Sequence, residues 1–257
     1  MRIRATGAAL VGALALTGLA VPAAQAAPVP KDVVIGDTTI TKVVVDGDNK
    51  VSVGTSAAKT FKVSVTAKDD SGIAGADTFS LAGPDYGYFT SGKPVCAKVS
   101  ATTSTCTASV TVDPKVDYLS NANAGTWYVD AMVEAKDGDF VWEEKAGSFK
   151  FQRASKLTAN ASPEPVKKGR TITVTGQLTR ANWETLKYAG YSGQSVKLQF
   201  CKKGSTTYTT LKTIKTDMKG NLSTTVTAGA DGYFRYAFAG TATTPAVNST
   251  ADFIDVK

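Results

Sequence analysis

Residues 61–65 read Phe-Lys-Val-Ser-Val, and this stretch decides the fold class because its apolar and polar side chains alternate one by one. In an extended strand successive side chains point to opposite faces, so Phe61, Val63 and Val65 share one face. Such alternation is typical of an antiparallel sheet with one buried and one wet face. Residues 171–175, Thr-Ile-Thr-Val-Thr, repeat the pattern more than a hundred positions later.

Short β-rich runs of this kind extend along most of the chain in two sets of seven, separated by turn residues. This spacing is typical of β-sandwich domains. The first set covers residues 40–45, 61–67, 76–81, 95–99, 108–112, 127–135 and 147–151. The second set covers residues 157–161, 170–178, 195–200, 207–214, 221–226, 233–239 and 250–256. Between them, residues 182–189 are compatible with one or two helical turns.

The first 26 residues have the pattern of a cleaved secretory signal peptide. Arg2 and Arg4 precede an uncharged apolar stretch over residues 7–20, and Ala24 and Ala26 supply the small residues of a cleavage site. The apolar stretch is shorter than the ~20 residues of a membrane span. We therefore expect a secreted, extracellular protein without a membrane span, divided into residues 27–153 and 154–257.

Composition excludes the commonest catalytic machinery. The chain of 257 residues contains no histidine and three cysteines. Without histidine there is no Ser-His-Asp triad, no Cys-His dyad and no imidazole zinc ligand. Three cysteines cannot form a thiolate zinc cage or an iron–sulfur cluster within one chain. We therefore expect a protein that is not an enzyme and requires no cofactor.

Four motifs resemble bacterial Ig-like domains. Residues 69–75 (DDSGIAG) look like a B–C corner, and residues 125–129 (GTWYV) resemble strand F. In the second half, residues 169–178 (GRTITVTGQL) resemble the start of another module, and residues 231–236 (DGYFRY) resemble its strand F. Together with the signal peptide they resemble secreted actinobacterial proteins built of tandem Ig-like β-sandwich domains, some of which carry a calcium-binding label. The resemblance implies a fold rather than an activity, because the sandwich hosts many functions.

Charge is divided unevenly between the two halves. The whole chain carries 29 Lys and Arg against 22 Asp and Glu, a net charge of +7. Residues 27–153 hold 13 basic and 16 acidic residues, net −3, whereas residues 154–257 hold 14 and 6, net +8. A basic extracellular surface could bind an anionic cell-wall polymer. The alternative interpretation is that lysines on solvent-exposed strand faces keep the protein soluble and prevent edge-to-edge pairing. Nucleic acid is not expected as a partner, because arginine-rich runs and stacking aromatic series are missing.

The cysteines predict one disulfide and leave one thiol. Cys96 and Cys106 flank a short polar segment in a chain expected to reach an oxidising compartment, which predicts a hairpin disulfide. By alternation, Cys106 falls on the same face as the inward-pointing Ala108 and Val110, whereas Cys96 falls on the same face as Lys98, which is expected to point outward. A bulge or an edge position is therefore needed to bring the two side chains to one face. Cys201 lies on the polar side of its predicted strand, which leaves open an incidental thiol, a disulfide-linked dimer or a reactive thiol.

Aspartates concentrate at the turns of the first half. If the strands run in Ig order, the B–C and F–G loops share one end, where Asp69 and Asp70 would meet Asp137 and Asp139. Calcium needs six to eight oxygen ligands, which carboxylates and carbonyls supply. Asp-Gly and Asp-Ser-Gly are also ordinary turn formers, so turn chemistry is the competing interpretation. The sequence therefore predicts Asp69, Asp70, Asp137 and Asp139 as candidate calcium ligands.

We expect a secreted, non-enzymatic binding or structural module of the cell surface or extracellular space. The partner would be an anionic wall polymer or an extracellular protein. One alternative is a calcium-binding protein that uses the first-half aspartates. The other is a secreted enzyme inhibitor with a rigid exposed loop at residues 83–94.

Overall fold

The computed structural model describes residues 32–257, and the signal peptide predicted over residues 1–26 lies outside them. Strands make up the regular structure of this range apart from a single 3-10 turn, Asn121–Asn123. No helix in the described range is long and apolar enough to cross a membrane. The predicted all-β fold with antiparallel sheets is therefore confirmed.

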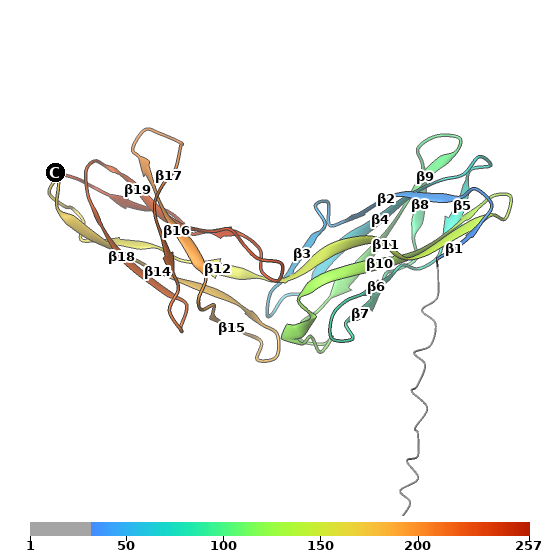
Figure 1. Ribbon diagram of the computed structural model, residues 1–257, viewed down its shortest axis with the longest axis horizontal. Helices are drawn as coiled ribbons and strands as arrows, with labels where there is room; N and C mark the ends of the chain where they lie inside the picture. The colour runs from blue at the N-terminus through green and yellow to red at the C-terminus, as the bar shows by residue number, and fades with distance from the viewer. Residues whose placement is uncertain (1–31) are drawn as a thin grey trace, which may run out of the picture. The chain divides into compact units, whose positions relative to one another are not determined.

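Strands β1 to β11 form two sheets (Figure 1). One sheet has the order β2-β4-β9-β8, and the other has the order β1-β11-β10-β6-β7, with β5 on β10 and β3 parallel to β11. These orders match the A-B-E-D and G-F-C-C′ sheets of an immunoglobulin sandwich. The bounds are β1 (Val33–Ile35), β2 (Thr39–Val45), β3 (Lys50–Val53), β4 (Lys59–Lys68), β5 (Ile73–Ala76), β6 (Ser80–Ala82), β7 (Tyr88–Thr90), β8 (Val95–Lys98), β9 (Thr103–Val112), β10 (Gly125–Ala135) and β11 (Phe140–Arg153).

Strands β12 to β21 repeat this plan. In one sheet β14 pairs with β12, β13, β15 and β18, and the other has the order β17-β16-β19-β20, with β21 on β19. The Ig-like order is therefore A-B-E on one side and C′-C-F-G on the other. The bounds are β12 (Ser155–Leu157), β13 (Asn160–Ser162), β14 (Thr171–Asn182), β15 (Lys187–Gly190), β16 (Ser195–Lys202), β17 (Thr209–Lys215), β18 (Asn221–Thr227), β19 (Gly232–Phe238), β20 (Val247–Asn248) and β21 (Asp252–Ile254). The exact division into residues 27–153 and 154–257 stays a prediction.

Each set of strands encloses its own hydrophobic core, and the alternating stretches point into it as expected. Phe61, Val63 and Val65 on β4 are at most 2% exposed and pack in one cluster with Trp127 on the facing β10. Ile172 on β14 is fully buried in the second cluster. Burial at about 25 cal/mol per Å² of apolar surface makes these two interfaces the main source of stability.

The helical turns considered for residues 182–189 are not formed. Asn182 and Lys187 instead pair across the turn that joins β14 to β15. The Asn182 side chain accepts the backbone N–H groups of Glu184 and Thr185, which favours a tight turn over a helix. Trp183 is buried in the turn, where its indole N–H donates to the Val53 carbonyl at 3.2 Å and its ring belongs to the first cluster.

Several other strands differ from their predicted ranges. The run predicted over residues 76–81 is divided between β5 and β6, and that over residues 157–161 between β12 and β13. Strands β1, β3 and β7 were not predicted, because each is only three or four residues long. Such short edge pairings depend on a partner strand, so local periodicity carries little signal for them.

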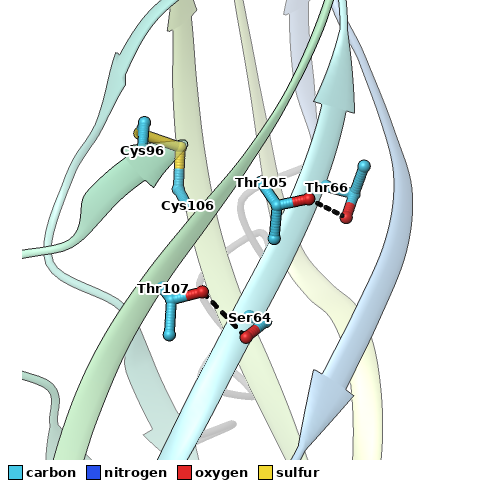
Figure 2. Close-up of a disulfide and its surroundings, with 6 residues drawn as sticks. All are labelled: Ser64, Thr66, Cys96, Thr105, Cys106 and Thr107. Atoms are coloured by element: carbon cyan, nitrogen blue, oxygen red, sulfur yellow. Dashed lines mark hydrogen bonds between the residues drawn. A yellow bond between two sulfur atoms is a disulfide. The ribbon is translucent and has the colours of Figure 1, made fainter. Parts of the chain in front are cut away.

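The predicted disulfide is present between Cys96 on β8 and Cys106 on β9 (Figure 2). The two residues are direct partners in the β8–β9 register, so both side chains point to the same face, and no bulge separates them. Strand β8 is the edge of its sheet, and the edge position therefore resolves the conflict in alternation. On the other face of β9, Thr105 and Thr107 exchange hydrogen bonds with the hydroxyl groups of β4.

Cys201 lies on the outer face of its sheet, as its alternation predicts, but it is covered. It pairs with Tyr233, which is 39% exposed, yet Cys201 itself is only 3% exposed. Its thiol donates to the Ser205 carbonyl at 3.2 Å, beneath the turn after β16. A disulfide to a second chain would require this turn to open, and the dimer stays a prediction.

Candidate functional site

Three turns bring aspartates to one end of the first set of strands. Asp69 and Asp70 follow β4, and Asp137 and Asp139 lie between β10 and β11. Asp37 comes from the turn between β1 and β2. The Ig-like order places these turns together because adjacent strands end at the same edge.

The carboxylates form two groups of three that share Asp69. In one group, oxygens of Asp69, Asp137 and Asp139 lie within 4.8 Å of one another, and in the other Asp69 is joined by Asp37 and Asp70. The structure thus brings together three of the four predicted ligands, and Asp70 belongs to the second group. Asp37 was missed because the segment before residue 40 was assigned to no strand, although its position just before a strand was a usable signal.

Asp69 is the centre of this arrangement and is 1% exposed. Its Oδ1 accepts the backbone N–H of Ser71 at 2.8 Å and the Ser71 hydroxyl at 2.6 Å, and its Oδ2 accepts the Thr38 hydroxyl at 2.6 Å. The Ser71 hydroxyl and then the Thr38 hydroxyl lower the pKa of Asp69 against an opposing desolvation effect. Asp69 is therefore held as an anion.

Asp37 experiences the opposite balance. Desolvation, followed by the negative charge of Asp70, raises the pKa of Asp37. Its backbone N–H donates to Asp139 Oδ2 at 3.2 Å, which links the two groups. Four ion pairs occur among residues 32–257, and none includes an aspartate of this cluster. The negative charge gathered here therefore lacks a paired side-chain cation within the described range.

The donor set suits a weak calcium site. A carboxylate oxygen has two lone pairs, so Asp69 Oδ1 is fully used by Ser71 while Oδ2 retains one. Asp137 Oδ1 accepts the Asp139 N–H at 3.1 Å, which leaves further lone pairs on both carboxylates. Three carboxylates supply three of the six to eight oxygens that calcium requires, and turn carbonyls and water would supply the others.

Cationic side chains in the second half are arranged differently. Arg235 stacks on Tyr208 at 3.6 Å and Arg180 on Tyr191 at 3.9 Å, measured from the guanidinium carbon to the ring centroid. Of the 14 basic residues after position 153, only Lys203 and Lys257 form ion pairs. Three of the other basic side chains, those of Arg180, Lys212 and Arg235, donate hydrogen bonds to neutral groups of the protein.

The segment considered as an inhibitor loop, residues 83–94, lies partly in the sheet, because three of its twelve residues form strand β7. Strand β7 lies within it and pairs with β6. Ser91 is buried, and its backbone N–H donates to the Phe79 carbonyl at 2.9 Å. The exposed residues of the segment are Pro84, Asp85, Tyr86, Tyr88, Thr90, Gly92 and Lys93, and the inhibitor function stays a prediction.

No family model and no curated protein matches the chain. Among solved structures it is similar to the D00-D0 domain of intimin (12% identity, 83% of this chain and 99% of that chain, TM-score 0.29). It is also similar to the D0-D1 domain of intimin (18% identity, 84% and 98%, TM-score 0.28). A third likeness is to three N-terminal domains of the highly immunogenic outer capsid protein of bacteriophage RB49 (10% identity, 86% and 70%, TM-score 0.32). The Ig-like fold is assigned from the strand order of this chain. The TM-scores of these similarities are too low to support it further.

Proposed function

We propose that this protein is a secreted, non-enzymatic binding module that attaches to an anionic polymer of the cell surface through its second half. The observation that carries the proposal is the excess of unpaired cations there, 12 of 14 basic side chains lying outside ion pairs. The Cys96–Cys106 disulfide supports an extracellular location, because disulfides persist in oxidising compartments. The missing histidine supports a non-enzymatic role.

The test is retention on purified wall teichoic acid at low and high salt. Lys197 on β16 and Lys215 on β17 are exposed on the same face of one sheet. We expect the double variant Lys197→Gln/Lys215→Gln to bind several-fold more weakly than the wild-type protein, and binding of both to fall as salt screens the charges. Retention is measured as the fraction bound in a sedimentation assay.

The matched control changes the same charge elsewhere. Lys42 and Lys62 are exposed on the β2 and β4 strands of the first half, and the variant Lys42→Gln/Lys62→Gln should bind like the wild-type protein. Equal losses in both double variants would indicate a non-specific charge effect and contradict the proposed surface. A lack of retention at low salt would reject the anionic polymer itself.

A second candidate function, calcium binding, is favoured by the two carboxylate groups that share Asp69. The ion would neutralise a cluster in which desolvation, followed by the negative charge of Asp70, raises the pKa of Asp37. Residues of both groups, Asp37, Asp69, Asp137 and Asp139, would hold it, with Asp70 at the edge. Because only three carboxylates of each group converge, we expect binding in the high micromolar to millimolar range, about 10⁻⁴–10⁻³ M.

Calcium at ten times its dissociation constant should stabilise the folded protein by about 1.4 kcal/mol, which is RT ln 11. This corresponds to a rise of roughly 3–6 °C in melting temperature for a protein of this size. The variant Asp137→Asn/Asp139→Asn should lose the calcium-dependent shift, while Asp46→Asn/Asp48→Asn in another turn should keep it. No heat in isothermal titration at millimolar calcium, with an unchanged melting temperature, would remove this candidate.

A further inference from the structure

A hollow of about 310 Å³ lies at the opposite end of β10 from the aspartate cluster. It is formed between the β6–β7 turn and the segment that leads through the 3-10 turn into β10, two elements that lie at the same end of the sandwich (Figure 1). Its rim carries Asp85, Tyr86, Tyr88, Asp117 and Tyr118, and Trp127 lies at its base. Neither the basic surface of the second half nor the aspartate cluster includes this hollow, although its β6–β7 wall belongs to the segment 83–94 considered for an inhibitor.

The β6–β7 turn is fastened tightly to the protein beneath it. Gly83 and Gly87 lie directly on the Trp127 indole, where an added Cβ would come within 2.1 Å and 2.6 Å of ring atoms. The Asn123 side-chain amide donates to the carbonyls of Pro84 and Asp85 at 3.0 Å and 3.2 Å. The Trp127 indole N–H in turn donates to the Asn123 carbonyl at 2.7 Å. Both walls of the hollow are therefore held by one connected set of contacts.

Two tyrosines on this fixed support are almost completely exposed. Tyr86 is 101% exposed and Tyr118 is 96% exposed, relative to a fully exposed residue of the same type. Both have left-handed backbone conformations, with φ of 58° and 49°, which residues other than glycine seldom adopt. Non-glycine residues in such conformations concentrate at ligand-binding positions, where the surrounding structure holds them in place. The rings are thus presented to solvent from opposite walls of the hollow.

We propose that this hollow binds a neutral oligosaccharide, with pyranose rings stacked on Tyr86 and Tyr118. The face of an aromatic ring is negative and attracts the polarised C–H groups on the flat side of a sugar. The exposed carboxylates of Asp85 and Asp117 are positioned at the rim to accept hydrogen bonds from sugar hydroxyls. This combination of aromatic walls with a few polar groups is what small-ligand sites share.

The charge of the hollow selects a neutral ligand. Two carboxylates lie at its rim, and no lysine or arginine is among the described residues that line it. The half of the chain that contains it has a net charge of −3. An anionic polymer or a nucleic acid would be repelled here, in contrast to the basic second half. This inference rests on the proposed binding function and extends it. It adds a neutral oligosaccharide as a second ligand, bound at a site separate from the basic surface of the second half.

The shape of the hollow favours a glycan over a protein partner. A stable protein interface covers about 800 Å² on each side and needs a well-packed apolar centre. Here two separate rings flank an open, polar space of a size suited to sugar units. Chains of β-1,4-linked sugars have all their ring substituents equatorial, so each unit offers a flat C–H face to such rings.

The experiment is titration of the purified full-length protein with the β-1,4-linked hexamers of glucose and of N-acetylglucosamine, followed by calorimetry and tyrosine fluorescence. At least one hexamer should bind, and Tyr86→Ala and Tyr118→Ala should each weaken it about tenfold, as truncation of an aromatic anchor does. Tyr86→Phe should retain most of the affinity, because stacking needs the ring and not the hydroxyl. Tyr233→Ala, an exposed tyrosine on β19, is the matched control and should bind like the wild-type protein.

The proposal fails if neither hexamer binds at millimolar concentration, or if both alanine variants bind as tightly as the wild-type protein. Protection of Tyr86 and Tyr118 by an extracellular protein, with no sugar binding, would also overturn it in favour of a protein partner. Wall teichoic acid retention separates this failure from failure of the proposed function. Retention without sugar binding rejects only the hollow, whereas loss of retention with intact sugar binding rejects only the basic surface.

Discussion

Replacement of Trp127 by alanine is expected to lower the free energy of unfolding by about 3–5 kcal/mol, the range observed when large aromatic residues are removed from cores. Trp127 is completely buried on β10. Its ring stacks on Phe89 with centroids 5.3 Å apart and packs against Phe151 at 4.8 Å. The vacated volume cannot close easily, because the surrounding rings are held on two different strands, Phe89 on β7 and Phe149 and Phe151 on β11.

The same substitution should loosen the β6–β7 turn. Gly83 and Gly87 pack directly on the indole, and the indole N–H holds the Asn123 carbonyl. Urea denaturation followed by circular dichroism measures the stability loss, and hydrogen exchange at Gly87 measures the loosening, since its N–H donates to the Pro84 carbonyl. If sugar binding survives the loss of Trp127, the support described for Tyr86 is wrong.

The control is Trp142→Ala. Trp142 is only partly buried on β11, and its indole N–H donates to Asp130 at 3.0 Å. We expect a clearly smaller loss of stability, because most of the cavity cost arises at fully enclosed sites. Equal losses for the two tryptophans would contradict the packing described for Trp127.

Removal of the disulfide is the second large effect. The variant Cys96→Ala/Cys106→Ala should unfold with a free energy lower by about 2–3 kcal/mol, because the bond closes a loop of roughly ten residues in the unfolded chain. The expected fall in melting temperature is about 5–10 °C. Edge strand β8 should show the greatest increase in hydrogen exchange, since the disulfide and its β9 pairing are what hold it.

Reduction offers an independent measurement of the same bond. A reducing agent should lower the melting temperature of the wild-type protein and leave the double alanine variant unchanged. Cys201→Ala should respond to reduction like the wild-type protein, because Cys201 is a buried thiol outside the disulfide. An undiminished melting temperature after complete reduction would show that the sheet holds β8 without the bond.

The fold could be predicted because its signal is local. Alternation at residues 61–65 and 171–175 requires one wet and one buried face, whatever the partner strands are. The Cys96–Cys106 disulfide could also be predicted from the sequence, since a short polar segment between two strands suggests a hairpin. Short edge strands such as β1 and β3 were out of reach, because they are stabilised by β11 from more than 90 residues away.

The candidate sites divide in the same way. The convergence of Asp69 with Asp137 and Asp139 follows from strand order once an Ig-like topology is assumed. The placement of Asp37 and Asp70 in a separate group with Asp69 depends on where each turn places its side chains. The exposure of Tyr86 and Tyr118 likewise depends on contacts among Gly83, Asn123 and Trp127 that no spacing in the sequence reveals.

By itself, the sequence determined the all-β class, the uneven charge and the lack of histidine chemistry, because composition and period-two alternation act residue by residue. Only the tertiary structure decided that Trp183 joins the first core, that Cys201 is covered and that two aromatic rings flank a polar hollow. These outcomes come from surfaces that meet only after the strands have paired. Their free energies depend on contacts between distant segments, which local propensity does not contain.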